Sequence, residues 1–155
     1  MDYTIIEINK NNYLMFDDMV FFRINGREKN KVDQLNSKIE KDVFTTLKNK
    51  NLTVLAAQID NKLVGWISLV YIPKIRKTHG KGYLYIDELW VNPMYRKKGI
   101  ALALMKKGEQ ICEKYNVIGL RLFVNIDNKE AFSLYEKCGY KNNGNGIFME
   151  KEILE

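Results

Sequence analysis

The clearest chemical pattern lies at positions 91–101, in the run Val-Asn-Pro-Met-Tyr-Arg-Lys-Lys-Gly-Ile-Ala, where an apolar segment meets an expected helix. The first backbone N–H groups of a helix lack intrahelical partners, and the helix dipole adds partial positive charge there. Gly99 and Ala101 lack bulk, so a phosphate can approach the backbone around Ile100 closely. Three cations precede them: Arg96, Lys97 and Lys98. The run therefore predicts a pyrophosphate-binding turn.

A charged helix end without a ligand is the alternative interpretation of this run. In that case Gly99 lowers helix stability, and three cations lie at the end of the helix that the dipole disfavours. A bound anion removes that mismatch, so the pattern favours a ligand. The run matches neither the P-loop pattern nor the Rossmann fingerprint.

Two adjacent carboxyl groups, Asp87 and Glu88, interrupt the otherwise apolar segment Tyr83–Val91. Burying them is unfavourable unless they are paired or functional. Adjacent residues of a strand point to opposite faces, so both can face one site only if the strand is bulged. The alternative is a salt bridge to one of the 25 Lys and Arg residues.

Two motifs in this chain resemble those of the GNAT family of N-acetyltransferases. Arg96-x-x-Gly99-x-Ala101 resembles the family's Q/R-x-x-G-x-G/A motif, which holds the pyrophosphate of acetyl-CoA. The second motif resembles N-x-x-A-x-x-x-Y-E-x-x-G-F/Y and comprises Asn128, Ala131, Tyr135, Glu136, Gly139 and Tyr140. The resemblance covers residues 83–140 well. Two residues depart from the common pattern: Ala101, where glycine is commoner, and Cys138, where an aliphatic residue is usual.

The resemblance implies that an amine attacks the thioester of acetyl-CoA directly, in a ternary complex. The attacking amine must be neutral, so the site needs a proton acceptor, and the leaving thiolate needs a proton donor. The family places the donor at Tyr135, whose alternative role is core packing on the apolar face of its helix. For the acceptor we favour Glu88 and place Asp87 second, with a water chain as a further option.

The resemblance also implies how acetyl-CoA is bound, with no metal ion. The turn binds the pyrophosphate, and strand backbone groups bond the pantetheine amides like an added strand. Asn128 contacts the pantetheine or pyrophosphate region, or caps its helix, and both roles are compatible. The expected cofactor-binding residues are Leu89, Val91, Arg96, Lys97, Lys98, Gly99, Ile100, Ala101 and Asn128.

The elements that must position these residues follow from periodicity and turn signals. The pattern predicts strands over 3–8, 52–59, 62–72, 83–91 and 117–124, with Asp60 and Asn61 in a tight turn. It predicts helices that end at Gly26 and Gly139, and helices over 32–47 and 98–115. A closing hairpin is expected from 140–142 and 147–153. The expected fold is α/β, a GNAT-like twisted mixed sheet of six or seven strands with helices on both faces.

Composition fits one globular domain over residues 1–155, with 46% hydrophobic and 28% charged residues. The two cysteines have no metal-ligand or disulfide spacing, and no apolar stretch is long enough to span a membrane. We therefore expect a cytoplasmic protein. The net charge of +6 suits either a polyanionic ligand or a diffuse lysine surface, and we expect no nucleic-acid partner.

These observations predict an N-acetyltransferase, an acyltransferase that moves the acetyl group of acetyl-CoA to a primary amine. The acceptor stays open among a protein amine, a polyamine, an amino sugar or aminoglycoside, and another small amine. A non-catalytic module that binds acetyl-CoA as a sensor or partner is the alternative function. A homodimer is compatible with the resemblance.

Overall fold

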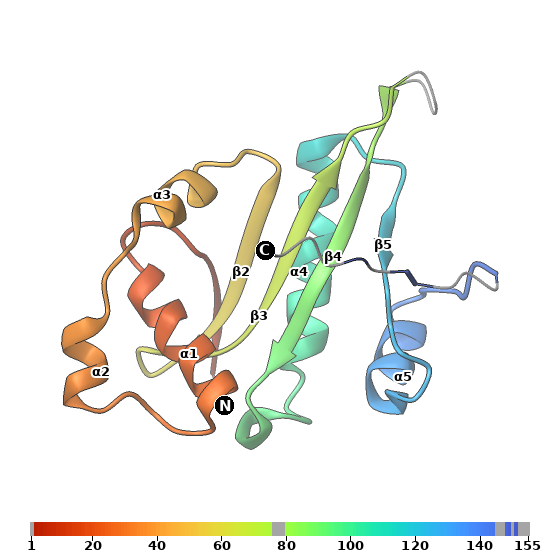
Figure 1. Ribbon diagram of the computed structural model, residues 1–155. Coiled ribbons are helices and arrows are strands. Elements are labelled where there is room, and N and C mark those ends of the chain that lie inside the picture. Colours follow the sequence, from red (N-terminus) through yellow and green to blue (C-terminus); the bar gives the residue numbers. More distant parts are fainter. Residues whose placement is uncertain (1, 76–79, 145–147, 150, 152–155) are drawn as a thin grey trace. The chain divides into compact units, whose positions relative to one another are not determined.

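The computed structural model describes residues 2–75, 80–144, 148, 149 and 151 (Figure 1). The chain forms two compact units, Met1–Leu122 and Phe123–Glu155. The first unit holds the sheet and four α-helices, and the second holds one α-helix among the described residues.

The sheet has five strands in the order β1-β2-β3-β4-β5 among the described residues. They are β1 (Thr4–Glu7), β2 (Leu52–Ile59), β3 (Lys62–Ile72), β4 (Tyr83–Val91) and β5 (Leu120–Leu122). The first four pair antiparallel, whereas β4 and β5 pair parallel. Helix α4 (Ile100–Tyr115) makes the crossover between these two strands, which a parallel pair requires. The mixed α/β sheet confirms the expected fold class.

The hairpin β2–β3 has the predicted bounds and turn. Asp60 and Asn61 have φ values of 44° and 61°, so both central residues adopt the left-handed conformation of a tight two-residue turn. Asn and Asp tolerate that conformation better than other side chains. The local turn chemistry thus sets the pairing of β2 with β3 from Ile59 opposite Lys62, and the register shifts once, between Ala57 and Gln58.

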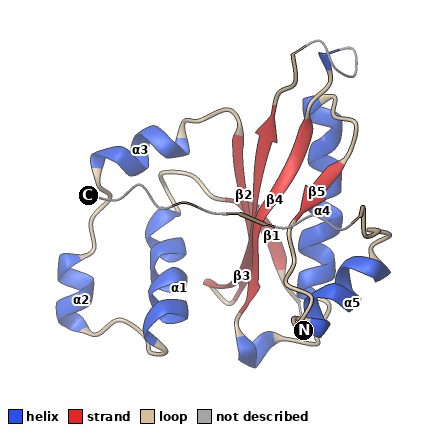
Figure 2. Cartoon of the chain, turned by 45° about the vertical axis from the view of Figure 1, so that its right-hand side comes forward, coloured by secondary structure: helices blue, strands red, loops and turns tan. Residues whose placement is uncertain are grey.

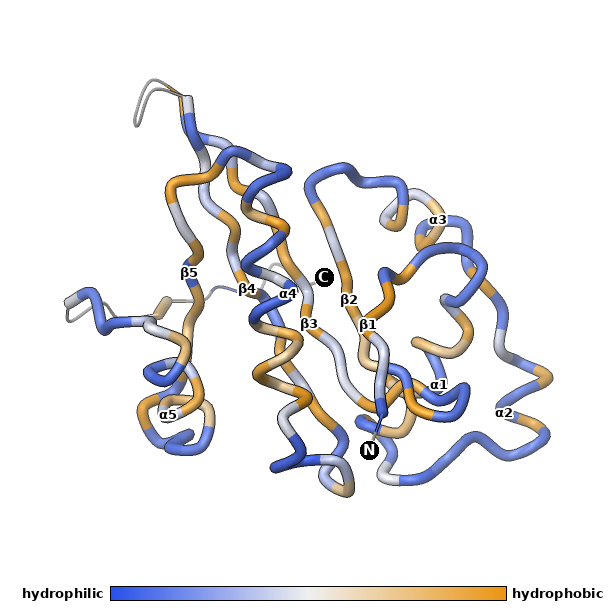
Figure 3. Tube along the Cα trace, turned by 180° about the vertical axis from the view of Figure 1, so that it is seen from behind, coloured by the Kyte–Doolittle hydropathy of each residue, from blue (hydrophilic) through white to orange (hydrophobic). Residues whose placement is uncertain are grey.

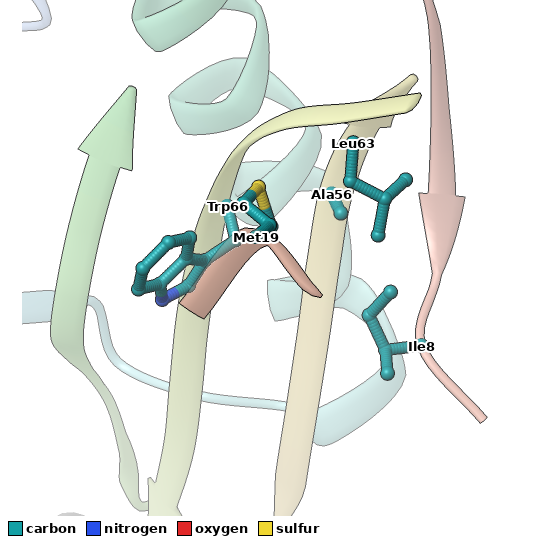
Figure 4. Packing of buried hydrophobic residues seen from close by; sticks show 5 residues of the cluster. All are labelled: Ile8, Met19, Ala56, Leu63 and Trp66. Carbon is teal, nitrogen blue, oxygen red and sulfur yellow. The ribbon is translucent and has the colours of Figure 1, made fainter. Parts of the chain in front are cut away.

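One face of the sheet packs against α1 (Tyr13–Asn25), which Gly26 ends with a φ of 67°. Figure 4 displays the centre of this core, where Met19 of the helix lies near Trp66 of β3. Trp66 is 1% exposed, and its ring lies edge-on to Phe16 at 5.5 Å between centroids. The remaining buried residues of the cluster are Ile8, Ala56 and Leu63.

The opposite face packs against α4, so helices lie on both faces of the sheet (Figure 2). The hydropathy colouring of Figure 3 alternates along the turns of α4, as expected for an amphipathic helix. Its buried residues recur at helical spacing and are Ile100, Leu104, Met105 and Gly108. A Cβ added at Gly108 would meet Leu69 and Ile67 at 3.4 and 3.5 Å, so glycine allows this close approach to β3.

The single helix expected over 32–47 is wrong, because two short helices occupy this stretch: α2 (Lys31–Asn36) and α3 (Lys41–Leu47). Asn30 and Asp33 form a capping box at the start of α2, and the extended backbone of Ser37 ends it. Val32 and Leu35 are 64% and 85% exposed, so the apolar periodicity of α2 marks no buried face.

Strand 117–124 is shorter than expected, because β5 is confined to Leu120–Leu122. Ile118 and Gly119 still exchange backbone hydrogen bonds with the start of β4, at 3.0 Å to Gly82 and 3.1 Å from Leu84. The predicted closing hairpin falls partly on residues 145–147, 150 and 152–155, which lie outside the described residues. The described residues around it form no strand, so the sheet has five strands here and not six or seven.

Candidate active site

Strand β4 contains a β-bulge at Asp87. Ser68 of β3 lies opposite Glu88, and the next residue, Leu69, lies opposite Ile86, so Asp87 has no partner in the register. The bulge meets the condition under which both carboxylates can face one site. Both residues are exposed, so neither incurs the burial penalty that the apolar sequence around them suggests.

The bulge changes which backbone groups of β4 face each neighbouring strand. Pairing with β5 covers Leu84–Ile86 and stops immediately before Asp87. Beyond the bulge, the N–H of Asn92 donates to the carbonyl of Val64 in β3 at 2.9 Å. Because alternate strand residues direct their backbone groups to opposite sides, Leu89 and Val91 direct theirs to the side of β5. These are the two residues predicted to pair with a pantetheine arm.

The turn after β4 is held by its own side chains. The buried Asn92 accepts a hydrogen bond from the N–H of Met94 at 3.0 Å, and Pro93–Tyr95 form a 3-10 turn. Arg96 Nε donates to the carbonyl of Val91 at 3.0 Å, and Lys98 Nζ donates to the carbonyl of Met94 at 3.2 Å. Two of the three predicted anion-binding cations therefore also support the turn.

Gly99 is the N-cap residue of α4 and has a φ of 81°, a conformation that favours glycine. Lys97, two residues earlier, is also left-handed, with a φ of 58°. A Cβ placed at Gly99 would meet only Tyr3 Oη within 4 Å, at 3.9 Å, so the space before the helix is open. Within the described part of the chain, no side chain caps the first N–H groups of α4. Ile100 is 1% exposed, so its side chain lies in the core and not in the space before the helix.

This geometry fits the diphosphate and pantetheine groups of acetyl-CoA. An open glycine cradle at an uncapped helix start can accept an anion, and an extended amide chain can pair with the backbone of Leu89 and with the N–H of Val91, whose carbonyl already accepts from Arg96. No group of three side chains suited to a metal ion occurs within residues 2–75, 80–144, 148, 149 and 151.

Glu88 of β4 contacts residues of the neighbouring strand β3 and of helix α1. Its Oε1 accepts from Arg23 Nη1 at 2.7 Å, and its Oε2 accepts from Trp66 Nε1 at 3.4 Å. Its backbone N–H donates to Ser68 Oγ at 3.1 Å. The salt bridge considered as an alternative for the acidic pair is therefore present at Glu88.

The sequence did not indicate Arg23, Trp66 or Ser68 as neighbours of Glu88. Arg23 lies 65 positions from its partner, and a salt bridge between a helix and a distant strand leaves no local spacing signal. The alternation in β3 and β4 could have placed Ser68 and Trp66 on the face of Glu88, once the bulge was assigned.

In the second unit, helix α5 (Lys129–Lys137) starts with Asn128 as its cap. Asn128 Oδ1 accepts from the N–H of Ala131 at 3.1 Å, which confirms the capping role. The helix ends in a Schellman motif, in which Tyr140 N–H donates to Tyr135 O at 3.0 Å and Gly139 N–H donates to Glu136 O at 2.9 Å. Gly139 has the expected left-handed φ of 84°.

The Schellman motif also fixes the ring of Tyr135. Its centroid lies 6.0 Å from that of Tyr140, the hydrophobic contact that commonly accompanies this helix end. Burial, with a smaller effect of Cys138, raises the pKa of the Tyr135 hydroxyl above its ordinary value of 10.0. The hydroxyl therefore keeps its proton at neutral pH and is available as a donor.

Three comparisons with known proteins agree with this fold and these motifs. The model of the acetyltransferase (GNAT) family matches residues 19–140. The spermidine N(1)-acetyltransferase of Thermoplasma acidophilum is 30% identical over 118 residues, which are 74% of this chain and 68% of that protein. The L-amino acid N-acetyltransferase of Escherichia coli is 30% identical over 94 residues, 59% of this chain and 55% of that protein.

A solved structure extends the similarity to the whole fold. AAC(6′)-Iy in complex with the bisubstrate analogue CoA-S-monomethyl-acetylneamine has a TM-score of 0.76 and 14% identity, with 98% of this chain and 99% of that chain covered. The chain therefore belongs to the GNAT family of acetyltransferases, enzymes that use acetyl-CoA as the acetyl donor. Among the described helices, none has the length and apolar content needed to cross a membrane.

Proposed function

We propose that this acetyltransferase moves the acetyl group of acetyl-CoA to a primary amine by direct attack in a ternary complex. One observation carries the proposal: the bulge at Asp87 turns the backbone of Leu89 and Val91 to the side of β5, immediately before the open helix start at Gly99. An extended, amide-bearing chain that ends in a diphosphate suits this succession of groups.

In the proposed complex the pantetheine amides pair with the backbone of Leu89 and Val91. The pyrophosphate contacts the N–H groups of Gly99, Ile100 and Ala101, and the matched motif assigns Asn128 to the cofactor as well. The basic side chains Arg96, Lys97 and Lys98 add positive charge. Arg96 and Lys98 also hold the turn through their bonds to carbonyl groups, so they position the backbone donors.

The proposed proton acceptor is Glu88, with Asp87 as the second candidate and a water chain as a further route. An alkylammonium must lose a proton before its nitrogen attacks the thioester carbon. The Glu88 carboxylate is partly exposed and fixed by Trp66 Nε1 and Arg23, so it has a defined position on the α1 face of the sheet. Asp87 is exposed at the bulge.

The proposed proton donor is Tyr135. As the amine nitrogen bonds to the carbonyl carbon, the C–S bond breaks and the CoA sulfur leaves with the electron pair. The Tyr135 hydroxyl gives its proton to that sulfur and recovers one from solvent. Support comes from the matched motif, and the hydroxyl, whose ordinary pKa of 10.0 burial raises further, is protonated at neutral pH.

The test is a thiol-release assay with acetyl-CoA and a panel of amines, preceded by calorimetric titration with acetyl-CoA, ATP and NAD. Binding of acetyl-CoA alone, with CoA release that depends on an amine, supports the proposal. Binding without release for any amine class favours the non-catalytic sensor. Absence of acetyl-CoA binding overturns the site assignment.

We further propose that residues 1–155 act as one catalytic domain in the cytoplasm, without a metal ion or a nucleic-acid partner. The family match over residues 19–140 crosses from one compact unit into the other, which supports a single functional domain. Cys112 and Cys138 are both half-buried and are not joined in a disulfide, which is compatible with a reducing compartment. Homodimerisation is a further proposal, to be tested by sedimentation.

A further inference from the structure

Arg23, Trp66 and Glu88 meet on the α1 face of the sheet, each from a different element. The Arg23 guanidinium bonds the Glu88 carboxylate at 2.7 Å and lies 5.0 Å from the centroid of the Trp66 ring. Trp66 Nε1 lies 3.4 Å from the other carboxylate oxygen of Glu88. A carboxylate and an indole face thus converge on one cation.

The cation in this arrangement is held at the surface. The side chains of Arg23 and Glu88 are 39% and 44% exposed, and an ion pair with that exposure contributes little net stability. Trp66 is only 1% exposed, and the guanidinium is one of the groups over its ring. Another cation could therefore replace Arg23 on the carboxylate and the indole at small cost.

We propose that Glu88 and Trp66 form a cation subsite for the acceptor, which Arg23 occupies when no acceptor is bound. The inference rests on the proposed function and names the acceptor class as a cationic alkylamine. The incoming ammonium displaces the guanidinium, bonds Glu88 and lies against the part of the indole ring that the guanidinium covers in its absence. Arg23 is then a specificity-determining residue that competes with the acceptor.

Two roles for Arg23, support of Glu88 and competition with the amine, predict opposite changes in the KM for the amine. If Arg23 only fixed Glu88, its removal would raise the KM for the amine or lower kcat. If Arg23 competes with the amine, its removal lowers the amine KM about fivefold, as expected for loss of a weak surface pair and a cation–π contact.

The binding experiment uses Arg23→Gln and methylguanidinium as the probe, with detection of the two tryptophan indole N–H signals by NMR. We expect a saturable shift of one indole signal in Arg23→Gln at millimolar probe and none in the wild-type protein. Arg121→Gln is the matched control, because Arg121 also lies over a ring, that of Tyr83 at 3.5 Å, outside this cluster. It should behave as the wild-type protein does.

Two further variants keep the test decisive. Arg23→Lys retains a cation and should bind no probe, whereas Glu88→Gln added to Arg23→Gln should abolish probe binding. Absence of a saturable shift in a well-dispersed spectrum of Arg23→Gln overturns the subsite.

The kinetic measurement uses the amine of the panel with the highest kcat/KM. A lower amine KM in Arg23→Gln, with an unchanged KM for acetyl-CoA, supports competition, and a higher amine KM overturns it. If no amine is acetylated by any variant, the proposed function fails, and the NMR titration still decides whether the cation subsite exists.

Discussion

A tyrosine hydroxyl acts as an acid only if it retains its proton until the leaving group forms. Tyr135 meets this requirement, because the ordinary tyrosine pKa of 10.0 already keeps the hydroxyl protonated at neutral pH and burial raises the pKa further. The side chain also has a fixed neighbour in Tyr140, which belongs to the same helix end. At the residue scale the proposed donor is thus placed by a backbone motif, and the sequence signature Tyr135 to Tyr140 encodes both.

We expect Tyr135→Phe to lower kcat by roughly 10²-fold to 10⁴-fold, because it removes the proposed proton donor and retains the ring. Acetyl-CoA affinity should stay within about twofold of the wild-type value, since the hydroxyl acts on the leaving thiolate. Steady-state kinetics and calorimetry measure the two effects. Tyr140→Phe is the matched control and should keep its turnover, and an unchanged kcat in Tyr135→Phe would remove Tyr135 as the acid.

Gly99 and Gly26 have similar backbone conformations in different surroundings. Their φ values are 81° and 67°, and an added Cβ meets at most one atom within 4 Å at either position. Replacing either glycine by an L-residue lowers the protein's free energy of unfolding by about 1–2 kcal/mol, because the new residue must adopt the left-handed conformation. A pair of substitutions therefore separates backbone strain from loss of the ligand site.

Gly99→Trp should weaken acetyl-CoA binding more than about tenfold, because the indole fills the space before α4. Gly26→Trp should show a similar loss of thermal stability and unchanged binding. Calorimetric titration of both variants is the measurement. Normal acetyl-CoA affinity in Gly99→Trp would refute the cradle assignment.

At the scale of elements, the turn and the helix ends marked by a single residue type were predicted correctly, whereas the division of the helix expected over 32–47 was not. The hairpin at Asp60 and Asn61, the end of α1 at Gly26 and the end of α5 at Gly139 all follow from residues in contact along the chain. The break between α2 and α3 was missed because the apolar spacing suggested one helix, whereas capping by Asn30 and the extended Ser37 divide it.

The features of the candidate site also separate into those that the sequence indicated and those that it did not. The turn before α4 and the cap at Asn128 were expected from neighbouring residues, and the bulge in β4 was the condition for Asp87 and Glu88 to face one site. The Arg23–Glu88 pair was not, since only the folded sheet brings α1 to β4. Side-chain partners that depend on tertiary packing carry no periodic signal in one sequence.

The β2–β3 turn offers a stabilising substitution. Asn61 has a φ of 61°, and glycine adopts this conformation without a steric penalty, so Asn61→Gly should stabilise the protein by about 0.5 kcal/mol. Denaturant unfolding measures the change. Asn61→Val should destabilise the protein instead, because a β-branched residue disfavours positive φ, and an equal effect of both substitutions would contradict this interpretation of the turn.

At the scale of the whole molecule, a nearly buried lysine ties the segment after α1 to the helices around it. Lys29 has a side chain 6% exposed and pairs with Asp17 and with Asp18, at 3.0 Å for the latter. It also donates to Ser37 Oγ at 2.7 Å. Burial alone would lower the pKa of Lys29, but the bonds to Asp17 and Asp18 outweigh it and raise the pKa above 10.5.

The raised pKa gives a stability contribution with a defined pH window. A folded-state pKa above the unfolded one means that the contribution is complete below about pH 10.5 and is lost as the pH rises through the folded value. The substitution Lys29→Met should lower the free energy of unfolding by about 1–2 kcal/mol relative to the wild-type protein at pH 7. The difference from wild type should shrink above pH 10.5.

Lys62→Met is the control for this measurement, because Lys62 pairs with Glu28 at 2.9 Å but is 67% exposed. It should change unfolding little at any pH, since an exposed pair contributes little. A difference between Lys29→Met and wild type that stays constant through the alkaline range would contradict the assigned role of Lys29.

The extra residue at Asp87 changes which residues of β4 direct their backbone groups to the side of β5. Before it, Leu84 and Ile86 lie in the pairing with β5, and after it the odd-numbered Leu89 and Val91 take that direction. A one-residue insertion or deletion between the bulge and Asn92 would exchange the backbone groups offered to the cofactor with those that bond β3, whereas a two-residue change would restore the order. Length variation in this strand should therefore be tolerated only in even steps.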